Sequence, residues 1–194
     1  MSVDLFGRPS LMDDGTRNEF DFYPTPRWMT RTLLHWHPEI KGKTVLEPAA
    51  GDDDITSVLT EAGCYVITND VDTRHPARFH MDAAQPAFWA MIAEMVWANS
   101  LPRIDYVVSN FPFNIAAQIL PHAVNLAPTA VVLRKTFLEP TEERGPWLST
   151  HPPSGFIGLP RHSFRGDGND SVTCDWMQWG LTPRIVIDPS AKLK

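Results

Sequence analysis

A short polar and aromatic segment follows an apolar run in the middle of the sequence. Residues 106–108 are β-branched and aromatic, which is typical of a buried strand, and Asn110, Phe111, Pro112 and Phe113 come soon after them. An asparagine amide beside a backbone carbonyl can hold both hydrogens of an NH2 group, and Phe113 offers a flat face for stacking. These residues predict a pocket for a planar substrate with an amino group. The alternative is a loop that buries both aromatic rings in the core.

A second segment has the composition of a ligand-binding turn. Residues 43–46 predict a strand that leads into a helix, and Glu47, Ala49 and Gly51 lie between the two. Gly51 allows the backbone to approach a ligand, which then faces the amino end of the helix. The aspartates at 52–54 also suit a solvated helix start, because this end of a helix favours negative charge.

These two segments need a scaffold that brings strand ends together. Short apolar runs alternate with amphipathic helical stretches up to residue 133, which predicts a parallel sheet with helices on both faces. Ligands bind such a sheet at the carboxyl edge of its strands. We expect strands at residues 43–46, 64–68, 78–81, 106–108, 130–133, 155–159, 172–179 and 184–187.

The chain has the size of one domain, with 194 residues and 43% hydrophobic content. Residues 1–22 are polar and lack a helical period, which predicts a flexible amino-terminal arm before a single domain at residues 23–194. A helix is expected to open that domain, with Thr25 as its N-cap and Pro26 at its first position.

Composition limits the classes of partner and compartment. The formal net charge of −6 argues against a protein that coats nucleic acid by bulk electrostatics, so such contacts need a local patch. We expect a cytoplasmic protein, because no apolar run could cross a bilayer and no leader pattern stands at Met1. Cys64 and Cys174 lie in separate strand-like runs without histidine at ligand spacing, which predicts buried thiols and no metal site.

Both chemical segments resemble motifs of one enzyme family. Residues 110–113 resemble the Asp/Asn/Ser-Pro-Pro-Tyr/Phe signature of amino-directed S-adenosylmethionine-dependent methyltransferases, with Phe111 in place of the first proline. Residues 47–53 are similar to the family motif Asp/Glu-x-x-x-Gly-x-Gly, with Asp53 in place of the final glycine. The resemblance implies an α/β, Rossmann-like class I methyltransferase fold. Its sheet would be doubly wound, seven-stranded and mostly parallel, with an antiparallel C-terminal strand.

The resemblance also implies the cofactor S-adenosyl-L-methionine. In the family a Thr-Pro segment lines the methionine end, an acidic residue like Asp70 binds the ribose, and a pair like Asp82 and Ala83 reads the adenine. For Asp70 a simple loop aspartate is the alternative, and a carboxylate at Asp53 would repel the methionine carboxylate unless it points to solvent. The implied cofactor-binding residues are Tyr23, Pro24, Thr25, Glu47, Ala49, Gly51, Asp70, Val71, Asp82, Ala83 and Asn110.

The family motif further implies roles at the acceptor end. Asn110 and the Phe111 carbonyl would hold the amine while the base stacks on Phe113, so the implied catalytic residues are Asn110, Phe111, Pro112 and Phe113. Residues 159–173 resemble phage-type DNA adenine methyltransferases, in which an aromatic helps to hold the flipped base; a core aromatic is the alternative for Phe164. The substrate-binding residues expected are Phe113, Arg134, Lys135, Arg144, Arg161, Phe164 and Arg165, the cations contacting phosphates.

Together these expectations describe methylation of the exocyclic N6 amine of adenine in double- or single-stranded DNA. No separate target recognition domain remains in the chain, which predicts low or short sequence specificity. One alternative is a methyltransferase of this fold acting on an RNA base or a protein glutamine. The other is a protein that has lost catalysis and binds only nucleic acid or cofactor. The departures from the family motifs at Phe111 and Asp53 support this alternative.

Overall fold

The computed structural model describes residues 24–160 and 173–187. Five expectations lie outside these residues: the flexible arm at 1–22, the cofactor role of Tyr23, and the substrate roles of Arg161, Phe164 and Arg165.

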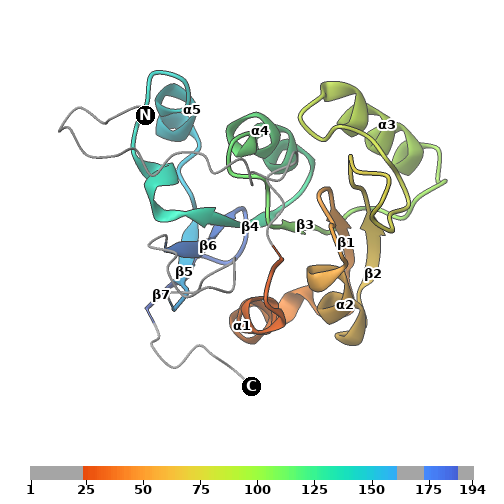
Figure 1. Cartoon of the computed structure of the whole chain (residues 1–194), viewed down its shortest axis with the longest axis horizontal. Helices are drawn as coiled ribbons and strands as arrows, with labels where there is room; N and C mark the ends of the chain where they lie inside the picture. The colour runs from red at the N-terminus through yellow and green to blue at the C-terminus, as the bar shows by residue number, and fades with distance from the viewer. Residues whose placement is uncertain (1–23, 161–172, 188–194) are drawn as a thin grey trace, which may run out of the picture.

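The described residues form a seven-stranded sheet in the order β2-β1-β3-β4-β6-β5-β7, with helices on both faces (Figure 1). Neighbouring strands are parallel except that β6 runs antiparallel to β4 and β5. This confirms the predicted α/β fold with a mostly parallel sheet and an antiparallel strand near its C-terminal end. The strands are β1 (Thr44–Glu47), β2 (Tyr65–Thr68), β3 (Tyr106–Ser109), β4 (Thr129–Arg134), β5 (Gly155–Gly158), β6 (Cys174–Trp179) and β7 (Ile185–Ile187).

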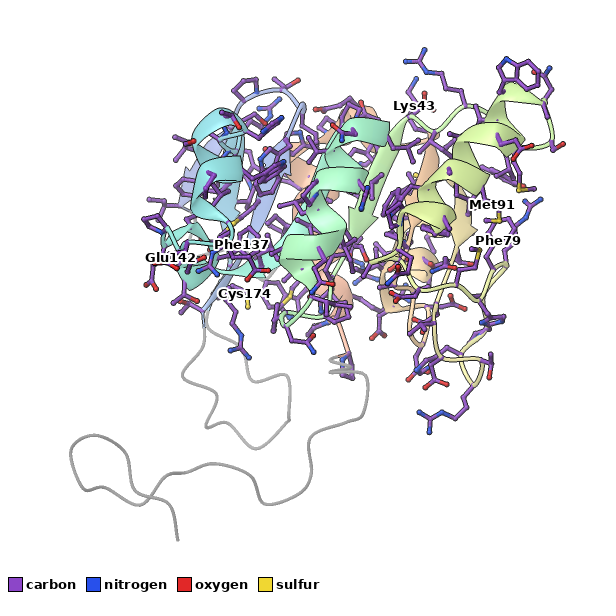
Figure 2. All side chains as sticks on the ribbon, turned by 90° about the horizontal axis from the view of Figure 1, so that it is seen from above. Lys43, Phe79, Met91, Phe137, Glu142 and Cys174 are labelled. Atoms are coloured by element: carbon purple, nitrogen blue, oxygen red, sulfur yellow. The ribbon has the colours of Figure 1, made fainter. Side chains whose placement is uncertain are left out.

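Two layers of helices enclose the sheet because its strands are apolar on both faces. On β3, Val107 packs toward one layer and Val108 toward the other, and both side chains are fully buried. Figure 1 shows α1 and α2 below the sheet and the other α-helices above it, and Figure 2 looks onto that upper layer. The helices are α1 (Arg27–Trp36), η1 (Pro38–Ile40), α2 (Asp54–Glu61), α3 (Pro86–Trp97), α4 (Ala116–Leu126), η2 (Lys135–Leu138) and α5 (Gly145–Thr150).

The strand expected at residues 78–81 is reduced to an isolated bridge between Asn69 and Phe79. A side chain replaces the strand pairing here. The Asn69 amide accepts from the Met81 N–H at 3.0 Å and donates to the Met81 carbonyl at 2.9 Å, so Met81 pairs with a side chain and not with β2. The prediction of a third strand at this place was therefore wrong, although the segment still runs along the same edge.

Two further local expectations need correction. Helix α1 begins at Arg27 with Pro26 as its N-cap, so Thr25 is not the N-cap and Pro26 is not the first helical residue. The Thr25 hydroxyl instead accepts from Asn110, which follows β3. The segment after β4, which the sequence suggested was a loop, contains η2 and the short helix α5. The predicted buried thiols are confirmed, since Cys64 and Cys174 are both free and buried. No helix in the described parts of the chain is long and apolar enough to cross a bilayer.

Gly155, at the start of β5, leaves no room for a Cβ atom beside the backbone of Arg184. A Cβ atom at this position would lie 2.2 Å from the Arg184 carbonyl oxygen, just before β7. We predict that Gly155→Ala pushes β7 away and lowers the free energy of unfolding by about 1–3 kcal/mol. Urea denaturation measures this change. Gly145→Ala is the matched control, because its Cβ would make only an ordinary 3.5 Å contact with Pro140, and an equal effect of both changes would contradict the prediction.

Candidate cofactor and acceptor site

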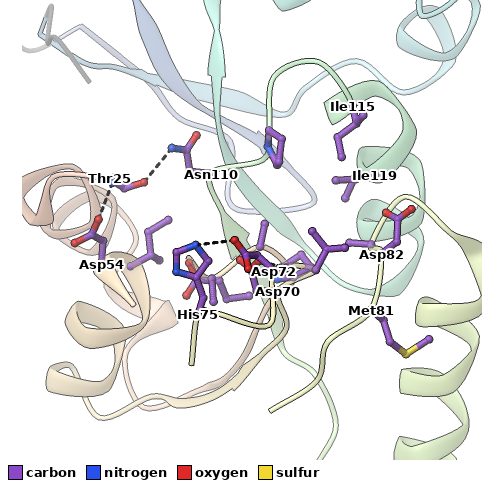
Figure 3. Close-up of a pocket in the computed structure, with 18 residues that line it drawn as sticks. Thr25, Asp54, Asp70, Asp72, His75, Met81, Asp82, Asn110, Ile115 and Ile119 are labelled. Atoms are coloured by element: carbon purple, nitrogen blue, oxygen red, sulfur yellow. Dashed lines mark hydrogen bonds and ion pairs between the residues drawn. The ribbon is translucent and has the colours of Figure 1, made fainter. Parts of the chain in front are cut away.

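A cavity with about 710 Å³ of empty volume opens at the edge where β1, β2 and β3 end (Figure 3). The strands are parallel, so their carboxyl ends and the loops that follow them meet on one side of the sheet. The cavity brings together many of the residues expected from the sequence. Those that line it are Thr25, Glu47, Ala49, Asp70, Val71, Asp82, Ala83, Asn110 and Pro112.

Asp70 joins the two loops on the floor of this site. One carboxylate oxygen accepts the Gly51 N–H at 2.8 Å, and the other accepts the Asp72 N–H, also at 2.8 Å. The side chain is nearly buried and still lines the cavity. Each carboxylate oxygen has a second lone pair, so Asp70 can accept from ligand hydroxyls while it holds both loops.

Glu47 closes the end of β1 as a fully buried carboxyl group that accepts a hydrogen bond from the Thr56 hydroxyl. Burial raises the pKa of Glu47 well above its ordinary value. The nearby charges of Asp53 and Asp54 raise this pKa further, while the Thr56 hydrogen bond acts in the opposite direction.

Asp53 occupies the position of the family's final glycine and adopts a glycine-like backbone. Its φ of 62° lies in the left-handed region, as does the φ of 54° at Gly51. The Asp53 side chain is half-buried and does not line the cavity. Asp53 therefore takes a backbone conformation that glycine favours, and its carboxylate is not among the side chains that line the cavity.

Three ionisable lining residues were not expected from the sequence: Asp54, Asp72 and His75. His75 lies between two loops, with Nδ1 2.8 Å from an Asp52 oxygen and Nε2 3.8 Å from Asp72. Hydrogen bonds from Arg74 lower the pKa of Asp72 to about 2. Asp54 is the first residue of α2, whereas Asp72 and His75 lie in the loop after β2, where the sequence has no periodicity that would reveal their contacts.

The opposite end of the cavity has an apolar wall. Met81, Ala83, Ile115 and Ile119 line it, and Ala83 is almost completely buried. The Asp82 carboxylate accepts the Ala84 N–H at 2.9 Å, which fixes the start of this loop. A flat aromatic ring suits such a wall, and the polar edge at Asp82 suits an amino group on that ring.

Asn110 stands at the rim of the cavity, at the end of β3. Its Nδ2 donates to the Thr25 hydroxyl oxygen at 3.0 Å, and the Thr25 N–H donates to Asp54 at 2.9 Å (Figure 3). These contacts join the segment before α1 to the first turn of α2 and to β3. The predicted acceptor residue thus lies beside the loops expected to hold the cofactor.

The two aromatic residues of the 110–113 segment do not line the cavity. Phe111 is 1% exposed and packs in the core beneath α3 and α4. Phe113 packs on the other side of the sheet, and the Arg134 guanidinium carbon lies 4.7 Å from its ring centroid. The Phe111 ring is therefore wholly packed in the core, and the Phe113 ring is partly packed. The alternative interpretation, a loop that buries both aromatic rings, expected such packing.

Three of the cations expected to contact phosphates belong to the described residues, and all three are engaged within the chain. Arg134 lies over Phe113, and Lys135 Nζ is 3.5 Å from Asp175. Arg144 donates to the carbonyls of Phe137 at 2.7 Å and Thr136 at 3.0 Å, so it ties η2 to α5. This geometry gives Arg144 a structural role, and it leaves Arg134 and Lys135 as the described candidates for phosphate contacts.

The sequence and the fold were compared with those of known proteins. No protein-family model matches the sequence. Over 126 residues the chain is 27% identical to the ribosomal RNA small subunit methyltransferase A of Leifsonia xyli subsp. xyli, covering 61% of this chain and 44% of that protein.

Solved structures extend this likeness across most of the fold. A modification subunit of a putative type I restriction enzyme from Vibrio vulnificus matches with a TM-score of 0.62 and 14% identity, over 89% of this chain and 46% of that one. A putative class I S-adenosylmethionine-dependent methyltransferase from Listeria monocytogenes matches with a TM-score of 0.56 and 12% identity, over 86% and 68%. The chain has the class I methyltransferase fold. It spans less than half the length of the Leifsonia and Vibrio proteins.

The Listeria protein is named as dependent on S-adenosylmethionine. The residues of this methyltransferase fold suit that molecule, which carries a sulfonium and an ammonium group. Five carboxyl side chains and one histidine are among the lining residues, so the negative charge needed to attract a cation is present. No group of three His, Cys, Asp or Glu residues gathers for a metal ion within residues 24–160 and 173–187.

The left-handed backbone at Asp53 leads to a stability prediction. Glycine adopts this conformation without steric cost, so Asp53→Gly should raise the free energy of unfolding by about 0.5–1 kcal/mol. Asp53→Ala is the matched control, because it removes the same carboxylate and keeps a Cβ at a φ of 62°. Urea denaturation of both variants separates backbone strain from charge. An equal gain in the free energy of unfolding for Asp53→Ala would show that the carboxylate charge, and not backbone strain, destabilises the wild type.

The buried carboxyl of Glu47 leads to a pH prediction. Its pKa is raised above the ordinary value of 4.5 in the folded protein, so its contribution to stability is present below pH 4.5 and is lost as pH rises toward the folded pKa. Glu47→Gln cannot ionise, so we expect its stability relative to the wild type to improve as pH rises from 4.5. Unfolding curves at several pH values test this. The same change at exposed Glu94 controls for the loss of a surface carboxyl.

Proposed function

We propose that this chain binds S-adenosylmethionine in the cavity and transfers its methyl group to the N6 amine of adenine in DNA. The observation that carries the proposal is the position of Asn110. It stands at the rim of the cavity, at the end of β3, beside the loops that follow β1 and β2. A methyl donor held by those loops would lie next to an amide suited to hold an amine.

Three parts of the cavity would hold the three parts of the cofactor. Asp70 would accept hydrogen bonds from the ribose hydroxyls, and the apolar wall with Asp82 would hold the adenine. The loop from Glu47 to Gly51 would face the methionine end, near the amino end of α2. The cofactor supplies an electrophilic methyl group on a positively charged sulfur.

The residues of the acceptor end would catalyse the transfer by positioning. Asn110 and the backbone carbonyl of Phe111 would accept the two hydrogens of the amine, which concentrates lone-pair density on its nitrogen. A bond forms between nitrogen and the methyl carbon as the bond between that carbon and sulfur breaks, and the amine then releases one proton to water. Because Phe111 is buried, its backbone carbonyl is held by core packing where the family uses proline.

A base inside a duplex cannot reach this cavity, so the target adenine would have to be single-stranded or flipped out of the helix. DNA is the first candidate because of the resemblance to phage-type DNA adenine methyltransferases. RNA is the second candidate, since the Leifsonia relative is named for ribosomal RNA. Arg134 and Lys135, at the end of β4, would contact the phosphates of either nucleic acid by leaving their present contacts with Phe113 and Asp175.

The experiment that tests the proposal measures transfer of a labelled methyl group to several acceptors. Single-stranded DNA, duplex DNA, RNA and a protein mixture are incubated with labelled S-adenosylmethionine, and nucleosides are analysed after digestion. Labelled N6-methyldeoxyadenosine supports the proposal. Label found only in RNA or only in protein would mean that RNA or protein, and not DNA, is the substrate. Cofactor binding with no transfer to any acceptor would favour the lapsed protein.

Asn110→Ala tests the acceptor site directly. It removes the side chain expected to hold the amine, so methyl transfer should fall by at least about 100-fold, while the Kd for S-adenosylmethionine stays within about twofold. Filter assays and calorimetry measure the two quantities. Asn114→Ala is the control, because Asn114 is exposed in the same segment and does not line the cavity. Retained transfer by the Asn110 variant would reject the assignment.

A further inference from the structure

Three segments that are distant in the sequence meet at Thr25. The Thr25 N–H donates to Asp54 in the first turn of α2 at 2.9 Å, across 29 residues of sequence. The Thr25 hydroxyl oxygen accepts from Asn110 Nδ2 at 3.0 Å, across 85 residues. Thr25 is 4% exposed, so both contacts lie within the folded structure. They connect the first turn of α2 with the residue that follows β3 (Figure 3).

The orientation of the Asn110 amide decides whether it can hold an amine. One end of an asparagine amide carries two donors, and the other end is an acceptor. If the amide were rotated by 180°, its NH2 group would face the hydrogens of the substrate amine. Two donors would then meet, and the favourable contact would become unfavourable. A partner that fixes this rotation therefore controls the chemistry without touching the substrate.

We propose that Thr25 is a positioning residue that holds the Asn110 amide with Oδ1 directed at the acceptor amine. The inference rests on the function proposed above. The hydroxyl oxygen of Thr25 engages the NH2 end of the amide, and the Asp54 carboxylate lies directly behind Thr25. A negative charge on that side favours the donor end of the amide there, so electrostatics and the hydrogen bond select the same rotamer.

The altered motif explains why this chain needs such a partner. A proline after the asparagine restricts the conformation of the residue before it. Phe111 lacks that restriction, and its burial fixes the backbone at its own position, one residue beyond Asn110. Thr25 gives the Asn110 side chain a contact from outside its own segment.

The first test compares two variants that differ in a hydroxyl group. Thr25→Val keeps the shape of the side chain and loses the acceptor oxygen, so kcat for methyl transfer should fall about tenfold. Thr25→Ser keeps the oxygen, so its kcat should stay within about twofold of the wild type. The Kd for S-adenosylmethionine should change by less than about twofold in both variants. A weaker Kd with an unchanged kcat would overturn the proposal, because Thr25 would then be a cofactor contact only.

A second test asks whether Thr25 acts through the amide. In Asn110→Asp the carboxylate has two equivalent oxygens, so no orientation needs to be selected. Thr25→Val should then reduce kcat by less than about twofold relative to N110D alone. A loss of about tenfold in both backgrounds would overturn the proposal, since the effect of Thr25 would be independent of the amide.

A third measurement does not depend on activity, so it separates this inference from the proposed function. The side-chain NH2 signals of Asn110 in a ¹⁵N–¹H spectrum are assigned by their absence in N110D. Thr25→Val should shift both signals and speed their exchange with solvent at least threefold, while Thr25→Ser should preserve them. If the signals do not change, Thr25 does not hold the amide. If they change as expected but the wild type methylates no acceptor, the contact stands and the proposed function fails.

Discussion

The buried carboxylate of Asp70 is the interaction on which the rest of the site depends. Parallel pairing of β1 and β2 brings two loops to the same edge, where the Ala50 N–H donates to the Asn69 carbonyl at 3.0 Å. Asp70 adds a side-chain link, because its carboxylate accepts from Gly51 in one loop and from Asp72 in the other. This closure of the floor of the cavity holds the two loops together.

The same closure concentrates negative charge, and the surrounding contacts make that charge tolerable. Arg74 pairs with Asp72, His75 bridges Asp52 and Asp72, and the amino end of α2 lies next to the aspartates. Glu47 accommodates its burial by a raised pKa. The charge that remains faces the cavity. A cationic ligand is therefore favoured there, which agrees with a sulfonium cofactor better than with an anionic one.

Local patterns predicted the sheet and the helices, because each strand and helix carries its own apolar periodicity and each motif lies at a strand end. The prediction was wrong where a single side chain overrides local pairing, as at Asn69, whose amide replaces a third strand. It missed α5 among prolines and glycines, and it did not anticipate that Arg144 binds backbone carbonyls. Such contacts join segments that only the folded chain brings together, so no spacing in the sequence encodes them.

The two departures from the family motifs share one physical explanation. Proline and glycine fix or permit a backbone conformation through their own covalent structure. At Asp53 two backbone hydrogen bonds flank the left-handed turn: the Asp53 N–H donates to the Ala50 carbonyl at 3.1 Å, and the Ser57 N–H donates to the Asp53 carbonyl at 2.8 Å. At Phe111 core packing holds the side chain at the position where the family has a proline ring. Hydrogen bonds of the turn at one position and core packing at the other thus take the place of covalent restraint, and the geometry of the site depends on these contacts as well as on its motifs.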